Sequence, residues 1–201
     1  SGEAGGCPTA HNRIRNDGSI DWHMESAFGG QGGITGQAAA LGYHGDACCA
    51  EPDGYANDWY EAIRLTYAGA ATLSFDYLLD SEEDYDFLQV ETGSLCTSFD
   101  RVDYGLDPGG SANTFRDIVL FRSGLETNGS IVAQALTNYG PGTHCVYIAF
   151  VSDYGFSPCD GDQPSTLREG LVVDHLSITD AGGTRGEDFG DGTLDIGTFV
   201  N

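Results

Sequence analysis

The chain has 201 residues, of which 30 are glycine, and its 31 acidic residues against 8 basic ones give a formal net charge of −23. A field this negative argues against nucleic acid and anionic membrane surfaces as partners, because binding phosphate requires clustered cations. No apolar run approaches the roughly 20 residues that span a bilayer, so membrane insertion is not expected either.

Among the acidic residues, aspartate outnumbers glutamate by 21 to 10, and all eight basic residues are arginine. Divalent cations bound to clustered aspartates would explain this balance. A salty medium that screens the charge, or simple solubility of a secreted surface, would explain it equally well.

Apolar residues recur at every second position in several short segments, which is the pattern of strands with one buried face. Residues 58–67 could also form a short amphipathic helix, but their β-branched and aromatic content favours a strand. The pattern therefore predicts an all-β fold, an antiparallel β-sandwich with long loops. In chain order, the predicted strands cover residues 19–28, 61–67, 71–79, 86–92, 115–122, 130–136, 144–152 and 170–179.

The segments around these strands differ in composition. Residues 1–18 form a polar, glycine-rich N-terminal segment, so the predicted sandwich spans residues 19–180. Within it, residues 29–58 are expected to form one long loop, of a length that is usually functional or held by disulfides.

The last segment, residues 181–201, is expected to hold a linker and a C-terminal strand in which Leu194, Ile196 and Val200 alternate with other residues. A strand with one apolar face must pair with a sheet edge. It could be an edge strand of its own sandwich, a strand donated to a neighbouring subunit, or the start of a further module.

The cysteines are even in number and lack the CxxC spacing of zinc sites, which favours disulfides in an oxidising compartment over reduced cytosolic thiols. Adjacent cysteines rarely bond to each other, so Cys48 and Cys49 are expected to have different partners; the pairing is otherwise open. The six residues are Cys7, Cys48, Cys49, Cys96, Cys145 and Cys159.

Two acidic loops follow predicted strands. The first holds Asp80, Glu82, Glu83, Asp84 and Asp86, and the second holds Asp153, Asp160, Asp162 and Glu169. They suggest calcium, which takes six to eight oxygen ligands. Asp174 differs from the other acids because it lies on a strand between Val173 and Leu176, where a buried carboxylate needs a metal or a hydrogen-bond network. Solvated acidic turns are the alternative. The candidate metal ligands are Asp86, Asp153, Asp160, Asp162, Glu169 and Asp174.

Aromatic residues in the loops are candidates for ligand binding, because an exposed ring can stack on the face of a sugar. The candidates are Tyr43, Trp59, Tyr154 and Phe156. Packing in the core or against a loop is the alternative, and it is favoured for Trp59.

No pattern of catalytic residues is evident along the chain. The five histidines are scattered, and no GxSxG, phosphate-binding or dinucleotide-binding motif occurs. Paired carboxylates that could cleave glycosidic bonds will arise by chance among so many acids. We therefore expect no enzymatic activity.

Two blocks of sequence carry a family resemblance. Leu73–Tyr77 leads through an acidic turn to Asp86–Glu91, and Ile148–Asp153 leads through an acidic loop to Gly170–Ile178. This arrangement resembles the jelly-roll modules of the MAM and immune-inhibitor-A metallopeptidase type, and the adhesin modules of gingipains. In the modules of this type, the motif that matches Gly170–Ile178 contains an aspartate that corresponds to Asp174. The next position is histidine here, which departs from the pattern, so the resemblance does not define the full set of metal ligands.

The resemblance implies a jelly-roll β-sandwich that is secreted to the cell surface or beyond and often holds structural calcium. The HExxH motif of the peptidases is missing, so peptidase activity is not implied. We expect a non-catalytic, calcium-stabilised adhesion or binding module for a glycan or protein. The alternative is a structural subunit of an extracellular fibre or surface layer, assembled from copies of itself by strand donation.

Overall fold

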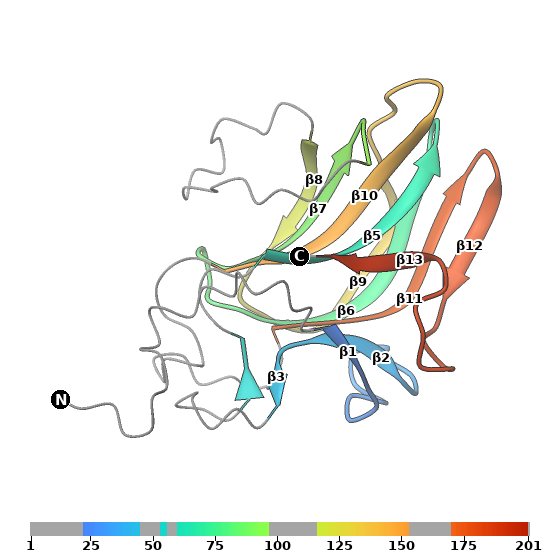
Figure 1. The fold of residues 1–201 in the computed structure, drawn as a ribbon. Coiled ribbons are helices and arrows are strands. Elements are labelled where there is room, and N and C mark those ends of the chain that lie inside the picture. The colour runs from blue at the N-terminus through green and yellow to red at the C-terminus, as the bar shows by residue number, and fades with distance from the viewer. Residues whose placement is uncertain (1–21, 45–52, 56–59, 97–115, 153–169, 201) are drawn as a thin grey trace, which may run out of the picture.

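The computed structural model describes residues 22–44, 53–55, 60–96, 116–152 and 170–200. No helix long and apolar enough to cross a membrane occurs in these ranges. The strands, coloured along the chain in Figure 1, are β1 (Trp22–Glu25), β2 (Ala38–Leu41), β3 (Tyr43–His44), β4 (Asp53–Gly54), β5 (Tyr60–Ala68), β6 (Thr72–Asp80), β7 (Phe87–Gly93), β8 (Arg116–Arg122), β9 (Leu125–Ala135), β10 (Thr143–Val151), β11 (Leu171–Asp180), β12 (Gly183–Glu187) and β13 (Gly197–Val200).

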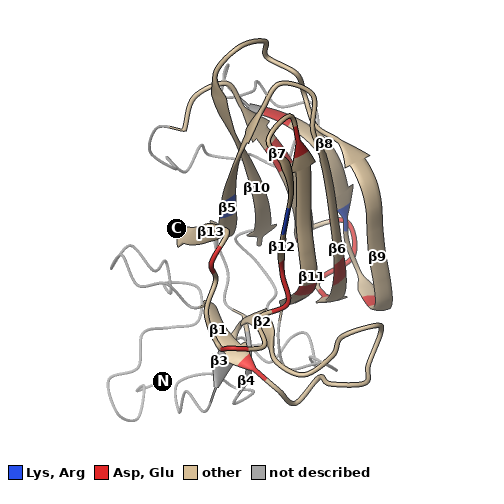
Figure 2. Ribbon diagram, turned by 90° about the vertical axis from the view of Figure 1, so that its right-hand side faces the viewer, with Lys and Arg blue, Asp and Glu red and all other residues tan. Residues whose placement is uncertain are grey.

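The strands form two antiparallel sheets packed against each other, so the predicted antiparallel β-sandwich is confirmed. The six-stranded sheet has the order β1-β2-β11-β6-β9, with β12 also paired to β11. The five-stranded sheet has the order β13-β5-β10-β7-β8. Strands β3 and β4 pair separately. Acidic residues far outnumber basic ones along the ribbon in Figure 2.

A series of strand pairs is nested in sequence order, with each pair enclosing the next along the chain. Strand β2 pairs with β11, β5 with β10, β6 with β9, and β7 with β8, all of them antiparallel. The first half of the chain therefore pairs with the second half in reverse order, and successive pairs alternate between the sheets. A long hairpin wound in this way over two sheets is the jelly-roll topology, which agrees with the expectation.

The core lies between the sheets and contains the residues that the alternating pattern placed on one face. Leu73, Phe75 and Tyr77 of β6 are buried there, as are Val146, Ile148 and Phe150 of β10. Burying each such side chain contributes on the order of 1.5–3 kcal/mol. The opposite face of β10 is buried as well, so this central strand is apolar almost throughout.

The predicted strand at residues 19–28 is shorter in the structure, where β1 ends at Glu25, and two segments expected to be loop or linker contain strands. The long loop expected at residues 29–58 contains β2, whose sequence AAAL shows no alternation because all four residues are buried. The linker expected after Thr179 contains β12, which has little apolar character and is positioned by its antiparallel hairpin register with β11. Pairing with neighbours, rather than local pattern, defines both strands.

The C-terminal strand β13 pairs with the edge of β5 in its own sandwich, with Phe199 opposite Ile63. The Phe199 ring stacks on Trp22 of β1 at a centroid distance of 5.4 Å. Gly197 permits the close approach, because a Cβ there would lie 2.6 Å from the Leu65 side chain. In this single chain, β13 is thus an edge strand.

Cys96 and Cys145 form a disulfide that spans 49 residues of sequence. Cys145 lies opposite Gly93 in the register of β10 and β7, so the bond ties the chain just after β7 to the start of β10. The other four cysteines, Cys7, Cys48, Cys49 and Cys159, lie outside the described residues.

Candidate functional site

The structure places only some of the predicted site residues. Of the six candidate calcium ligands, Asp86 and Asp174 are described, whereas Asp153, Asp160, Asp162 and Glu169 lie outside the described residues. Of the predicted ligand-binding aromatics, Tyr43 is in β3, whereas Trp59, Tyr154 and Phe156 lie outside.

Asp86 is a buried carboxylate at one end of the sandwich. Its Oδ2 accepts a hydrogen bond of 2.5 Å from the hydroxyl of Tyr55, and that hydroxyl accepts the N–H of Glu82 at 3.0 Å. Burial, reinforced by the Asp86 charge, raises the pKa of Tyr55 far above its usual value, so the phenol stays protonated. Because Val151 lies opposite Phe87, Asp86 is next to the point where the second acidic loop begins.

Asp174 lies in the other sheet and is fully buried. Its Oδ2 accepts the backbone N–H of Thr35 at 2.8 Å, and its Oδ1 accepts the backbone N–H of His175 at 2.7 Å. The burial expected for this carboxylate is therefore compensated by a hydrogen-bond network. Asp86 directly precedes β7 of the five-stranded sheet. Among the described residues, no three His, Cys, Asp or Glu side chains are grouped to hold a metal ion.

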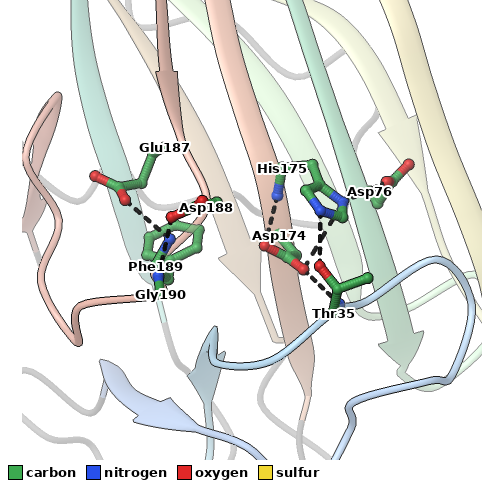
Figure 3. Close-up of polar contacts among 8 residues, drawn as sticks. All are labelled: Thr35, Asp76, Asp174, His175, Glu187, Asp188, Phe189 and Gly190. Carbon is green, nitrogen blue, oxygen red and sulfur yellow. Dashed lines mark hydrogen bonds and ion pairs between the residues drawn. The ribbon is translucent and has the colours of Figure 1, made fainter.

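His175 follows Asp174 at an irregularity of β11, where the register with β6 shifts between Asp174 and Ser177. Its φ of +48° is in the left-handed region, which is uncommon for a residue other than glycine. The imidazole Nδ1 lies 3.0 Å from Oδ2 of Asp76, and Nε2 lies 2.9 Å from Oγ1 of Thr35. Figure 3 shows the ring between these two partners.

The chemistry of the partners fixes the hydrogen positions in the neutral ring. A carboxylate only accepts, so Nδ1 carries the hydrogen and donates it to Asp76. Nε2 is then an acceptor, and the Thr35 hydroxyl donates to it. A carboxylate, an imidazole and a hydroxyl in this order can remove the hydroxyl proton during nucleophilic attack.

The loop between β1 and β2, residues 26–37, carries Thr35 and is packed onto the outer face of the six-stranded sheet. Phe28 and Ile34 of the loop join a small apolar cluster with Leu78 and Val172. Gly33 passes beside Asp76, where a Cβ would lie 3.4 Å from Oδ2. The loop is therefore held by apolar packing and by the Asp174 bond to its backbone.

A second group of residues in Figure 3 lies at the end of β12 and at the start of the segment that leads to β13. The Glu187 carboxylate accepts the N–H of Phe189 at 2.9 Å and that of Asp195 at 2.6 Å. Phe189 is fully buried in the main core. Asp188 accepts the N–H of Gly190 at 3.1 Å. These contacts fix the course of the chain toward β13.

Exposed aromatic rings occur where the sequence pattern did not select them. Tyr85 and Phe121 are 48% and 56% exposed. The rings of Phe121 and Phe87 pack edge to face, with their centroids 6.1 Å apart. Phe121 lies in β8, whose register with β7 shifts between Val90 and Glu91. Simple alternation along β8 therefore could not identify this exposed side.

No protein-family model matches the chain, and no curated protein matches it. The resemblance to MAM-type modules thus remains an expectation from sequence.

Proposed function

We propose that this protein is a secreted, calcium-stabilised adhesion or binding module whose ligand is a glycan or a protein. The observation that supports this most directly is the turn before β7. Tyr85 is exposed, Asp86 is buried, and Phe87 contacts the exposed ring of Phe121. A cation bound at Asp86 would order the turn that presents these rings.

The surface formed by Tyr85, Phe87 and Phe121 favours an uncharged ligand. Aromatic rings offer flat apolar faces to sugars, and nearby carboxylates can accept hydrogen bonds from hydroxyl groups. The net charge of −23 disfavours anionic ligands. The Cys96–Cys145 disulfide is in keeping with an oxidising, extracellular setting.

The test is binding to an array of neutral glycans, in calcium and in chelator, with two variants. Phe121→Ala removes an exposed ring and should weaken binding about twofold to tenfold, given ~0.5–1.5 kcal/mol for an aromatic contact. Val132→Ala is the matched control, because Val132 is 80% exposed on β9, and should bind as the parent does. Equal binding by parent and Phe121→Ala would reject this surface.

A second candidate is a structural subunit assembled by strand donation. The observation that favours it is β13, which adds only Gly197–Val200 to the edge of β5. The same edge could receive the strand of a neighbouring copy.

A further inference from the structure

Three side chains from separate parts of the fold meet on the outer face of the six-stranded sheet. Thr35 comes from the loop before β2, Asp76 from β6 and His175 from β11. Their contacts of 2.9 Å and 3.0 Å place hydroxyl, imidazole and carboxylate in sequence. We infer that Thr35, His175 and Asp76 form a site that hydrolyses short acyl esters.

This inference goes beyond the proposed binding function and departs from the expectation of a chain without enzymatic activity. That expectation rested on local motifs, and these three residues form none. Binding and hydrolysis are measured separately, so failure of one leaves the other intact.

The backbone of the site is held by one buried carboxylate. Asp174 accepts the N–H of Thr35 with one oxygen and the N–H of His175 with the other. The residue that supplies the hydroxyl and the residue that supplies the base are thus fixed relative to each other. Such preorganisation is what a nucleophile and its base require.

Contacts other than the hydroxyl–imidazole pair also hold the loop. The apolar cluster around Ile34 and the Asp174 bond already hold it. His175 nevertheless keeps a left-handed backbone, with a φ of +48°, that directs its ring between Thr35 and Asp76. Unfavourable backbone geometry of this kind is found at functional sites, where the surrounding structure maintains it.

The site is open to a substrate. Thr35 is exposed, and the side chain of His175 retains 40% of its accessible surface. Gly36, directly after Thr35, has a φ of +71°, and a Cβ there would meet no atom within 4 Å. Space beside the hydroxyl therefore admits an ester carbonyl, and the Gly36 N–H follows the nucleophile in the chain, where it can stabilise the developing oxyanion.

The reaction consumes only ester and water. Oγ1 of Thr35 attacks the carbonyl carbon while Nε2 of His175 takes the hydroxyl proton. The bond to the alcohol oxygen breaks, that oxygen takes the proton from Nε2, and an acyl-threonine remains. Water then attacks the acyl carbon and gives a proton to Nε2. The acyl–Oγ1 bond breaks, Thr35 regains the proton, and the carboxylic acid leaves.

The surroundings define the substrate class. Asp76 and Asp174 lie beside the imidazole, and the whole chain is strongly acidic, so an anionic acyl or alcohol group would be repelled. An open surface suits a small acyl group, such as acetyl, on an uncharged alcohol or phenol.

The experiment uses the full chain with p-nitrophenyl acetate. It follows nitrophenolate release and, after acid quenching, locates acetyl groups by peptide mass mapping. We expect saturable release and acetylation of Thr35. Thr35→Val keeps the shape and the backbone bond to Asp174 but removes the hydroxyl, so the rate should fall ~100-fold, in the range of lost acid–base catalysis.

Two further variants make the result specific. Asp76→Asn should lower the rate at least about tenfold, because the imidazole loses the partner that orients it. Thr193→Val is the matched control, since Thr193 is an exposed threonine whose hydroxyl contacts carboxylates and no imidazole; its rate should equal that of the parent.

Hydrolysis that persists in Thr35→Val would come from histidine alone and would overturn the inference. So would acetylation that never reaches Thr35. If Thr35→Val fails to fold, Thr35→Ser decides the question, because serine keeps a hydroxyl and should carry the acetyl group at the same position.

Discussion

The carboxylate of Asp174 accepts the backbone N–H of Thr35, a residue 139 positions earlier in the chain, at 2.8 Å. The contact joins the β1–β2 loop to a strand of the sheet beneath it. Because Asp174 is fully buried, its oxygens need hydrogen-bond partners within the protein, and each accepts a backbone N–H group. One side chain therefore compensates for its own burial and positions the loop.

Replacing Asp174 with asparagine should destabilise the protein. The amide nitrogen cannot accept a hydrogen bond, so one of the two N–H groups now bound loses its partner. An unsatisfied buried donor costs ~1–3 kcal/mol, which corresponds to a fall in melting temperature of roughly 2–12 °C for a chain of this length. Differential scanning calorimetry would measure it.

The matched control is Asp191→Asn. Asp191 also accepts a backbone N–H and a hydroxyl, both from Thr193, but it is exposed to solvent. Its replacement should leave the melting temperature almost unchanged. Equal effects at the two positions would show that burial of Asp174 is not what makes its contacts important.

How far the sequence predicts the fold depends on which contacts define each strand. In β6, Leu73, Phe75 and Tyr77 alternate because one face is buried in the core, so the pattern was sufficient. Strand β2 is buried on both faces and consists largely of alanine, so it shows no period. Strand β12 exists through its pairing with β11, which no local pattern reports.

The site was less predictable than the fold for the same reason. Asp174 could be selected as a carboxylate on an apolar strand, and the histidine at position 175 departs from the pattern of the modules that the sequence resembles. Thr35 and Asp76 carried no signal, because they reach His175 only through the packing of the β1–β2 loop and the pairing of β6 with β11. Long-range contacts of this kind are properties of the folded chain.

Removing calcium should lower the melting temperature if Asp86 belongs to a calcium site. A ligand bound only by the folded state stabilises that state by mass action, and each tenfold rise in free calcium above the dissociation constant adds about 1.4 kcal/mol. Melting curves measured across a calcium series would show the dependence. Asp86→Asn should reduce it, because calcium prefers charged oxygen ligands.

Magnesium at the same concentration is a suitable control for ionic strength, since it demands a tighter octahedral shell. Identical melting curves in excess chelator and in calcium would contradict the proposal. A calcium response that is unaltered in Asp86→Asn would leave the metal but remove Asp86 from its ligands.

High pH should unfold the protein through its buried tyrosines. Burial is the main cause that raises the pKa of Tyr55, Tyr67 and Tyr77 above the ordinary value near 10. Above about pH 10 the unfolded chain releases these protons while the folded chain retains them, so stability falls as pH rises. Each such tyrosine lowers the free energy of unfolding by about 1.4 kcal/mol per pH unit.

The measurement is ultraviolet absorbance of tyrosinate together with circular dichroism during an alkaline titration. Part of the tyrosinate signal should appear only with loss of the β-sheet signal. The chain contains no lysine, so lysine deprotonation does not contribute to the transition. Complete tyrosine ionisation while the sheets stay folded would refute the expectation.

The last prediction concerns β13 and separates an edge strand from a donated strand. Gly197→Val should prevent β13 from docking on β5, because even a Cβ at this position would lie 2.6 Å from the Leu65 side chain and 2.7 Å from the Arg64 carbonyl oxygen. If β13 pairs within its own sandwich, the variant should remain a monomer with a lower melting temperature, since Phe199 loses its stacking on Trp22. Light scattering and calorimetry on parent and variant test this. If the parent instead forms assemblies that the variant loses while its sandwich still melts cooperatively, the strand is donated between copies. Every copy of the variant carries the substitution in β13, so that strand can dock neither on its own β5 nor on a neighbour's.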